Sequence, residues 1–147
     1  MNPAATPVQN PLTLIMTFKS EEDQKKLNDI LLGFDDLPPG ENPLDRALVE
    51  IGTVHFARMV YVENNTKIAI ITTYDGTFEK YIQDFVEKVG DFFDVVLSHM
   101  KDAPPLPVRE HRDEFLAYVQ ANDLPSVIPL FSAYPNATVL TILDALE

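Results

Sequence analysis

The fold is decided by the stretch TVHFARMVYVENNTKIAIITTY, residues 53–74, which predicts a β-hairpin with two apolar faces. A two-residue turn with positive φ at Asn64 and Asn65 fixes the register of the two strands. An antiparallel sheet with one solvated face would show polar residues along one of its two rows, and neither row does until the turn. We therefore expect helices to cover one face and a second subunit to cover the other. The first row pairs His55 with Tyr74, Ala57 with Thr72, Met59 with Ile70 and Tyr61 with Ile68, and the second pairs Phe56 with Thr73, Arg58 with Ile71, Val60 with Ala69 and Val62 with Lys67.

The hydrophobic pattern on either side of the hairpin predicts further strands and helices. Residues 12–18 are short and apolar enough for a buried strand, and residues 78–89 carry the clearest helical stripe. Residues 127–133 predict a last strand, which Pro129 places at an edge of the sheet. Gly90 interrupts the long helix, which predicts two helices or one kinked helix. Other helices are expected after the N-caps Ser20, Asn42 and Asn136, and over residues 92–100 and 109–121.

This order of elements predicts an α+β fold of ferredoxin-like type. The series βαββαβ gives a four-stranded antiparallel sheet with its helices, including the extra ones, on one side, and leaves the other side for dimerisation. We expect residues 12–147 to form one such domain, because this length buries an adequate core. Residues 1–11 lack the basic and apolar regions of a secretory signal and predict a disordered tail.

Composition narrows the classes of partner. The formal net charge is −12, with only 11 Lys and Arg, which argues against binding to nucleic acid or to an anionic membrane. No apolar run reaches the roughly 18 residues of a membrane span. The absence of cysteine removes disulfides, thiolate catalysis and cysteine metal sites, and it fits the reducing cytoplasm, where we expect the protein to be located.

The predicted layout resembles that of the dimeric α/β-barrel superfamily. Three strings, GTVHFAR (residues 52–58), TTYDGTF (72–78) and SAYPNATV (132–139), are similar to those of a poorly characterised bacterial group of such proteins. The resemblance implies a ferredoxin-like fold and a homodimer. It brings no catalytic motif, because the superfamily includes small monooxygenases, haem-handling enzymes and proteins without a known reaction.

The candidate ligand-binding residues lie on the central hairpin. His55, with Tyr74 beside it and Met59 and Tyr61 along the strand, predicts a pocket between two packed sheets. A neutral imidazole there can act as a base or ligand, and the tyrosine can donate a hydrogen bond. The alternative is structural: a histidine satisfied by a neighbouring hydroxyl, with Met59 and Tyr61 in the core or an interface.

Arg58 is predicted on the opposite face of the same strand. A buried guanidinium keeps its charge and needs an acceptor, so we expect either a structural salt bridge or a grip on a ligand carboxylate or phosphate. The expected partners of the structural salt bridge are Asp75, Glu79 and Asp84.

The other two histidines predict no local metal motif. His99 ends a helix, where it can cap the last carbonyl groups, and His111 lies on a solvated helix face. No His pair shows metal-ligand spacing, although a site that brings His55 to His99 through the fold is an alternative.

These observations predict a small-molecule-binding homodimer with an apolar or carboxylate ligand and no assignable reaction. One alternative is a monooxygenase or haem-handling enzyme that uses His55 or His99, and another is a structural or partner-binding module. The residues specify no particular cofactor.

Overall fold

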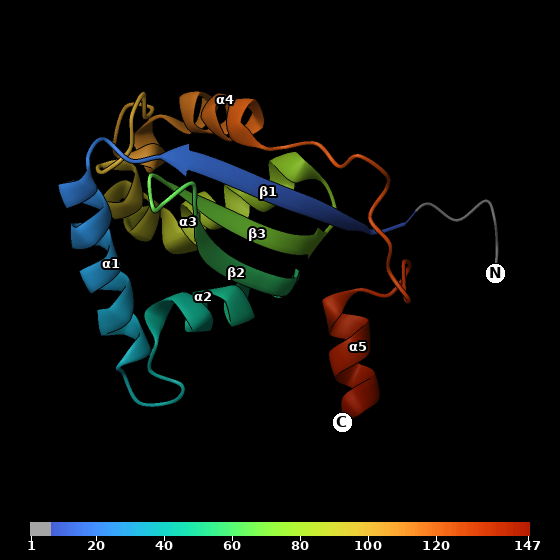
Figure 1. The fold of residues 1–147 in the computed structure, drawn as a ribbon. Helices are drawn as coiled ribbons and strands as arrows, with labels where there is room; N and C mark the ends of the chain where they lie inside the picture. Colours follow the sequence, from blue (N-terminus) through green and yellow to red (C-terminus); the bar gives the residue numbers. More distant parts are fainter. Residues whose placement is uncertain (1–6) are drawn as a thin grey trace.

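The computed structural model describes residues 7–147 as an antiparallel sheet with helices packed mainly on one of its faces (Figure 1). Within these residues the sheet has three strands in the order β1-β3-β2. A short 3-10 helix, η1, precedes α4. The elements are β1 (Gln9–Thr17), α1 (Glu21–Asp35), α2 (Pro43–Ile51), β2 (Val54–Val62), β3 (Lys67–Asp75), α3 (Phe78–Leu97), η1 (Val108–Glu110), α4 (Arg112–Asn122) and α5 (Val139–Leu146).

The register of the β2–β3 hairpin is confirmed from Phe56 to the turn. Asn64 and Asn65 both have positive φ, at 55° and 64°, as the two-residue turn requires. One predicted pair is wrong, because Tyr74 lies opposite Val54 and not opposite His55. A register shift between Val54 and Phe56, typical of a β-bulge, adds one residue to β2 there and turns His55 out of the ladder.

One face of the sheet forms the core with the helices. Leu12, Leu14 and Met16 of β1 and Ile68 and Ile70 of β3 are buried on this face. In Figure 1, α3 lies behind the strands and covers them. Its buried stripe matches the predicted one and includes Tyr81, Ile82, Phe85, Val86 and Val89. The core is completed by Val108, Phe115 and Val119 from η1 and α4.

The second face of the sheet is left without a helix, and we call it the open face. Phe56 and Arg58 are exposed on it, and of its other apolar side chains only Ala69 is buried. Both faces of the sheet are predicted to be covered, and within residues 7–147 only one of them is covered by helices. The open face consists of Gln9, Pro11, Thr13, Ile15, Thr17, Phe56, Arg58, Val60, Val62, Lys67, Ala69, Ile71, Thr73 and Asp75.

The predicted fourth strand over residues 127–133 is wrong, and the ferredoxin-like βαββαβ series is not completed. The segment follows the outer edge of β1 but pairs with it only at its ends, where Leu124 N donates to Thr13 O and Val8 N donates to Pro135 O. Between these points Pro125 and Pro129 lack the N–H groups that a ladder needs. The described residues therefore form an α+β fold with three strands.

The predicted helix starts are mostly confirmed. Ser20, Asn42 and Thr77 cap α1, α2 and α3 through their side chains. The cap of α5 is Thr138, two residues after the predicted Asn136. α3 is one kinked helix, with Val89 at a non-helical φ of −130° just before Gly90. Among residues 7–147, no helix is both long and apolar enough to span a bilayer.

The predicted disordered tail falls partly outside the described residues. Residues 1–6 are among those that the structure does not describe, whereas Gln9, Asn10 and Pro11 form the beginning of β1. The ordered chain therefore begins before the predicted boundary at residue 12. Its first strand reaches far enough to meet the C-terminal segment through Val8 and Gln9.

Candidate functional site: the histidine and carboxylate pair at the end of the hairpin

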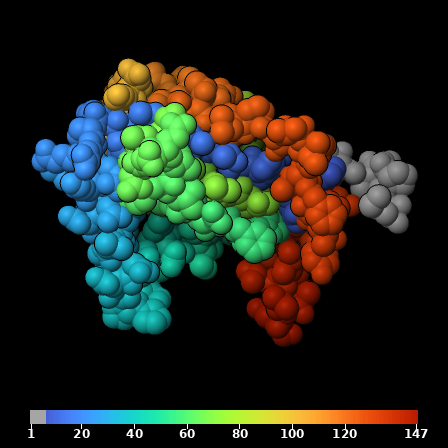
Figure 2. Space-filling view, in the orientation of Figure 1, coloured from blue at the N-terminus to red at the C-terminus, as the bar shows by residue number. Residues whose placement is uncertain are grey.

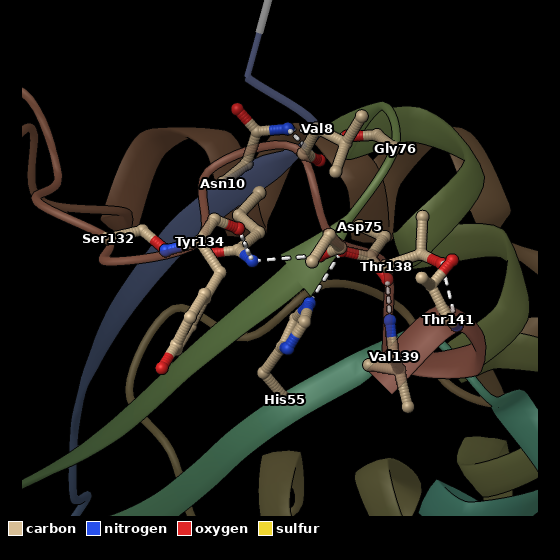
Figure 3. Close-up of polar contacts among 12 residues, drawn as sticks. Val8, Asn10, His55, Asp75, Gly76, Ser132, Tyr134, Thr138, Val139 and Thr141 are labelled. Atoms are coloured by element: carbon tan, nitrogen blue, oxygen red, sulfur yellow. Dashed lines mark hydrogen bonds and ion pairs between the residues drawn. The ribbon is translucent and has the colours of Figure 1, made fainter. Parts of the chain in front are cut away.

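His55 is held by a carboxylate at the end of β3. Its Nε2 lies 2.6 Å from Oδ1 of Asp75, and the two side chains are only 7% and 8% exposed. The other oxygen of Asp75, Oδ2, accepts a hydrogen bond of 2.7 Å from the backbone N–H of Val139. Figure 3 shows Asp75 between the imidazole and the first turn of α5. One carboxylate therefore joins β2, β3 and α5.

The hydrogen bonds of Asp75 assign the proton on the ring of His55. A carboxylate only accepts hydrogen bonds, so Nε2 of His55 must donate. In the neutral ring this leaves Nδ1 as an acceptor, and in the protonated ring Nδ1 becomes a donor. The pair thus fixes the orientation of an imidazole that retains one nitrogen for another partner.

An open groove of about 520 Å³ lies beside His55, between α2, β2 and α5. Figure 2 shows the molecule hollowed between α2 and the red α5. Asp45 and His55 are the ionisable residues of the lining. The remaining lining residues are apolar: Leu48, Val49, Val54, Phe56, Ala57, Val139, Ile142 and Leu143.

Tyr74 does not join His55 in this groove. It is buried in the core, where its ring stacks on that of Tyr81 with centroids 3.9 Å apart and planes at 8°. Burial, with a smaller contribution from the charge of Asp123, raises the pKa of Tyr74. The bulge in β2 is the cause of this separation, because it shifts His55 away from the position opposite Tyr74.

Met59 and Tyr61 line a different cavity, of about 290 Å³, between β2, α1 and α2. The hydroxyl of Tyr61 donates to Oδ1 of Asn28 at 2.8 Å, and burial raises its pKa. Met59 also lines a smaller cavity of about 220 Å³, together with Arg58 and Phe93. The predicted pocket residues are therefore spread over three neighbouring hollows along β2.

Arg58 lies on the open face, and the predicted salt bridge is wrong. Asp75 binds His55 instead, and Asp84 binds Lys80. Among residues 7–147, no carboxylate lies within ion-pair distance of Arg58. The face of the strand that carries Arg58 has no helix to supply an acceptor, and the bulge at His55 breaks the simple alternation that predicted His55 and Arg58 on opposite faces.

His99 and His111 each contact a separate carboxylate. Nδ1 of His99 lies 2.9 Å from Oδ1 of Asp23, which links the end of α3 to the start of α1. The hydrogen bonds from the Ser20 hydroxyl and from His99 lower the pKa of Asp23. His111 pairs with Glu114 on an exposed surface. Within residues 7–147, no three His, Asp or Glu side chains are grouped to hold a metal ion.

Sequence reasoning missed two residues that hold the C-terminal segment beside the groove. Asp75 is predicted only as an ion-pair partner of Arg58, and Gln9 only as part of the disordered tail. Nε2 of Gln9 donates to the carbonyl groups of Tyr134 and Ala137, both at 2.8 Å. The polar character of Asp75, at the end of the predicted hairpin, and of Gln9, just before the predicted first strand, is the only signal in the sequence. Their partners lie too far away in the sequence to be inferred from it.

Comparison with protein-family models, with curated proteins and with solved structures finds no match for this chain. The chemistry of the site therefore has to be argued from its own geometry.

Proposed function

We propose that this chain is a small-molecule-binding protein whose ligand lies in the groove between α2, β2 and α5. The observation that supports this most directly is the lining: apolar side chains around one buried imidazole held in place by Asp75. Ligand sites are typically concave and mostly apolar, with few polar groups that fix orientation. His55 supplies that polar contact through Nδ1.

The lining favours an uncharged ligand with one hydroxyl donor. Asp45 places a carboxylate in the wall, and the lining contains no Lys or Arg. Nδ1 of a neutral His55 accepts a hydrogen bond, so a donor group on the ligand matches it. A carboxylate ligand would instead have to reach Arg58, which lines only the adjoining smaller cavity.

Titration followed by amide NMR shifts tests this proposal. We expect 1-octanol to shift amides of α2, β2 and α5 more strongly than octanoate does. His55→Ala should weaken the 1-octanol response at least fivefold, whereas the matched control His111→Ala, on the exposed start of α4, should leave it unchanged. Equal responses of the two histidine variants, or shifts confined to other elements, would remove the groove as the site.

We also propose that the protein is a homodimer in which the open face meets a second subunit. Several apolar side chains are partly exposed on this face, among them Ile15, Val60 and Ile71, and contiguous apolar surface of this kind marks interaction sites. Light scattering at micromolar concentration measures the mass directly. A mass of one chain would contradict the homodimer without affecting the ligand proposal.

The enzyme alternative rests on the same imidazole, which Asp75 orients as a carboxylate orients a catalytic base. Haem fits these residues poorly, because Asp75 already holds Nε2 of His55, and the free Nδ1 is the nitrogen nearer the main chain. His99 lines none of the three hollows along β2. A haem absorption band that disappears in His55→Ala would favour the enzyme over the binding protein.

A further inference from the structure

We propose that residues 124–146, which we call the C-terminal arm, pack onto the open face of a second copy of this chain. This inference rests on the proposed homodimer and adds the contact that the arm makes in it. Each copy would give its arm to the other and receive the other's arm in return.

The arm exposes more apolar surface than any other part of the described chain. Val127 is 101% exposed and Phe131 is 86% exposed. Nine of the sixteen exposed large hydrophobic residues among those described belong to the arm. Such a concentration is unusual for a surface that faces only water. The nine are Leu124, Val127, Ile128, Leu130, Phe131, Tyr134, Leu140, Leu143 and Leu146.

The arm is also uncharged over most of its length, up to Asp144. Residues 124–143 contain no Asp, Glu, Lys or Arg, although charged residues make up 23% of the chain and about five would be expected in such a length. An exposed surface without charge gains little from hydration and loses little when it is covered. The composition of the arm therefore fits a covered position.

The arm is fixed to its own chain at two places and stands free of it between them. Leu124 is bound to Thr13, and the later part is held by Val8, Gln9 and Asp75. Figure 3 shows this second anchor around Tyr134, Thr138 and Val139. The exposed side chains are consequently presented in a defined place, which reduces the entropy lost on docking.

The distribution of charge favours a second copy of this chain as the partner that covers the open face. A chain of net charge −12 repels another copy except where acidic residues are absent. The acidic strand residue on the open face is Asp75, which is only 8% exposed and already bound by His55, and the arm is neutral up to Asp144. Arg58 has no ion-pair partner among residues 7–147, whereas Asp144 follows the neutral stretch of the arm. We assign Asp144 of one copy to Arg58 of the other.

The positions of the two surfaces allow both to be buried at once. In Figure 2 the strands of the open face are visible in the middle, and the orange and red arm forms one margin of that face. A two-fold interface uses the same patch on both subunits. Two open faces that approach each other would therefore bring each arm to the sheet of the opposite copy.

Sedimentation velocity on full-length variants tests the arm. Phe131→Ser should weaken dimerisation at least about tenfold, as expected for an aromatic anchor. The matched control is Leu32→Ser on α1, which is also exposed but lies outside both surfaces and should leave dimerisation unchanged. Arg58→Glu should weaken the dimer, and adding Asp144→Arg to it should restore association.

Filtered NOE spectra of a mixed dimer, with one copy labelled with carbon-13, give the contact directly. We expect signals between methyl groups of Ile128 in one copy and Ile71 in the other. A dimer that keeps its affinity in Phe131→Ser, or that shows contacts only between the two sheets, would overturn the arm proposal and leave the homodimer standing. A wild-type monomer would overturn both.

Discussion

The β2–β3 hairpin and the C-terminal arm are both apolar, yet the hairpin forms two of the three strands of the sheet and the arm lies exposed. Ile68 and Ile70 in the hairpin are buried, whereas Ile128 and Phe131 in the arm face solvent. The hairpin has a turn at Asn64 and Asn65 and a full set of N–H groups, so its residues pair. The arm has prolines at the places where pairing with β1 would continue. Hydrophobicity alone therefore does not decide burial; the capacity to satisfy the backbone does.

The largest expected effect is the difference in stability between the two regions. Ile70→Ala should lower the free energy of unfolding by about 2–5 kcal/mol, because it leaves a cavity in the core. Phe131→Ala should change it by less than about 0.5 kcal/mol when measured at a concentration where the protein is monomeric. Urea denaturation measures both. A loss above about 2 kcal/mol in Phe131→Ala would show that the arm packs within its own chain and would break the comparison.

The next largest effect is expected at Asp75, which joins the hairpin to the arm through His55 and Val139. Asp75→Ala leaves Nε2 of His55 and the N–H of Val139 without their acceptor, which should cost about 1–3 kcal/mol. Hydrogen exchange at residues 139–146 should accelerate more than exchange within β3. Ser132→Ala, which changes a polar contact of the exposed part of the arm, serves as the control. Unchanged exchange in α5 would mean that Asp75 is not what holds it.

A smaller effect should follow when the arm is given back its N–H groups. Pro125→Ala combined with Pro129→Val should allow residues 125–131 to pair with β1, since the prolines are what interrupts the ladder. We expect slower amide exchange in this segment and a change of about 1 kcal/mol or less in stability. Pro105→Ala in the connector before η1 is the matched control. Exchange as fast as in the wild type would point to a cause other than proline.

The smallest effect should be confined to alkaline pH. Burial raises the pKa of Tyr74 above its ordinary value of 10.0, so the folded state keeps this proton where the unfolded state loses it. The contribution of Tyr74 to the free energy of unfolding is therefore complete below pH 10 and is lost as the pH rises through the raised pKa. Tyrosinate absorbance should show a late component that is missing in Tyr74→Phe. If Tyr74→Phe instead removes absorbance that arises at about pH 10 and leaves the late component in place, the ring of Tyr74 lies in solvent.

Local signals predicted the parts of the fold that depend on neighbouring residues. The positive φ of Asn64 and Asn65 and the caps at Ser20 and Asn42 are properties of short sequences, and they are confirmed. The bulge that turns His55 away from Tyr74 could not be foreseen, because the alternating pattern continues through it without a glycine. One such insertion was enough to separate two residues of the predicted pocket.

Contacts between distant segments account for the rest. Asp75 meets Val139, and Gln9 meets Tyr134, across separations that no local pattern encodes. The predicted salt bridge of Arg58 is wrong because the alternation of a strand shows which residues share a face, but not which face a helix covers. The predicted fourth strand does not form because Pro125 and Pro129 together remove two N–H groups, more than an edge strand next to β1 tolerates.

The kink of α3 has a consequence for the hollow that Met59 shares with Phe92 and Phe93. A Cβ atom built at Gly90 would lie 3.3 Å from Nε of Arg109, whose guanidinium fills the space that a side chain would need. The guanidinium of Arg109 therefore occupies the space beside Gly90, the residue next to the bend. A methyl group at residue 90 would press on the side chain of Arg109, which would have to yield by a few tenths of an ångström next to the bend that leads to Phe92 and Phe93 in the wall of that hollow.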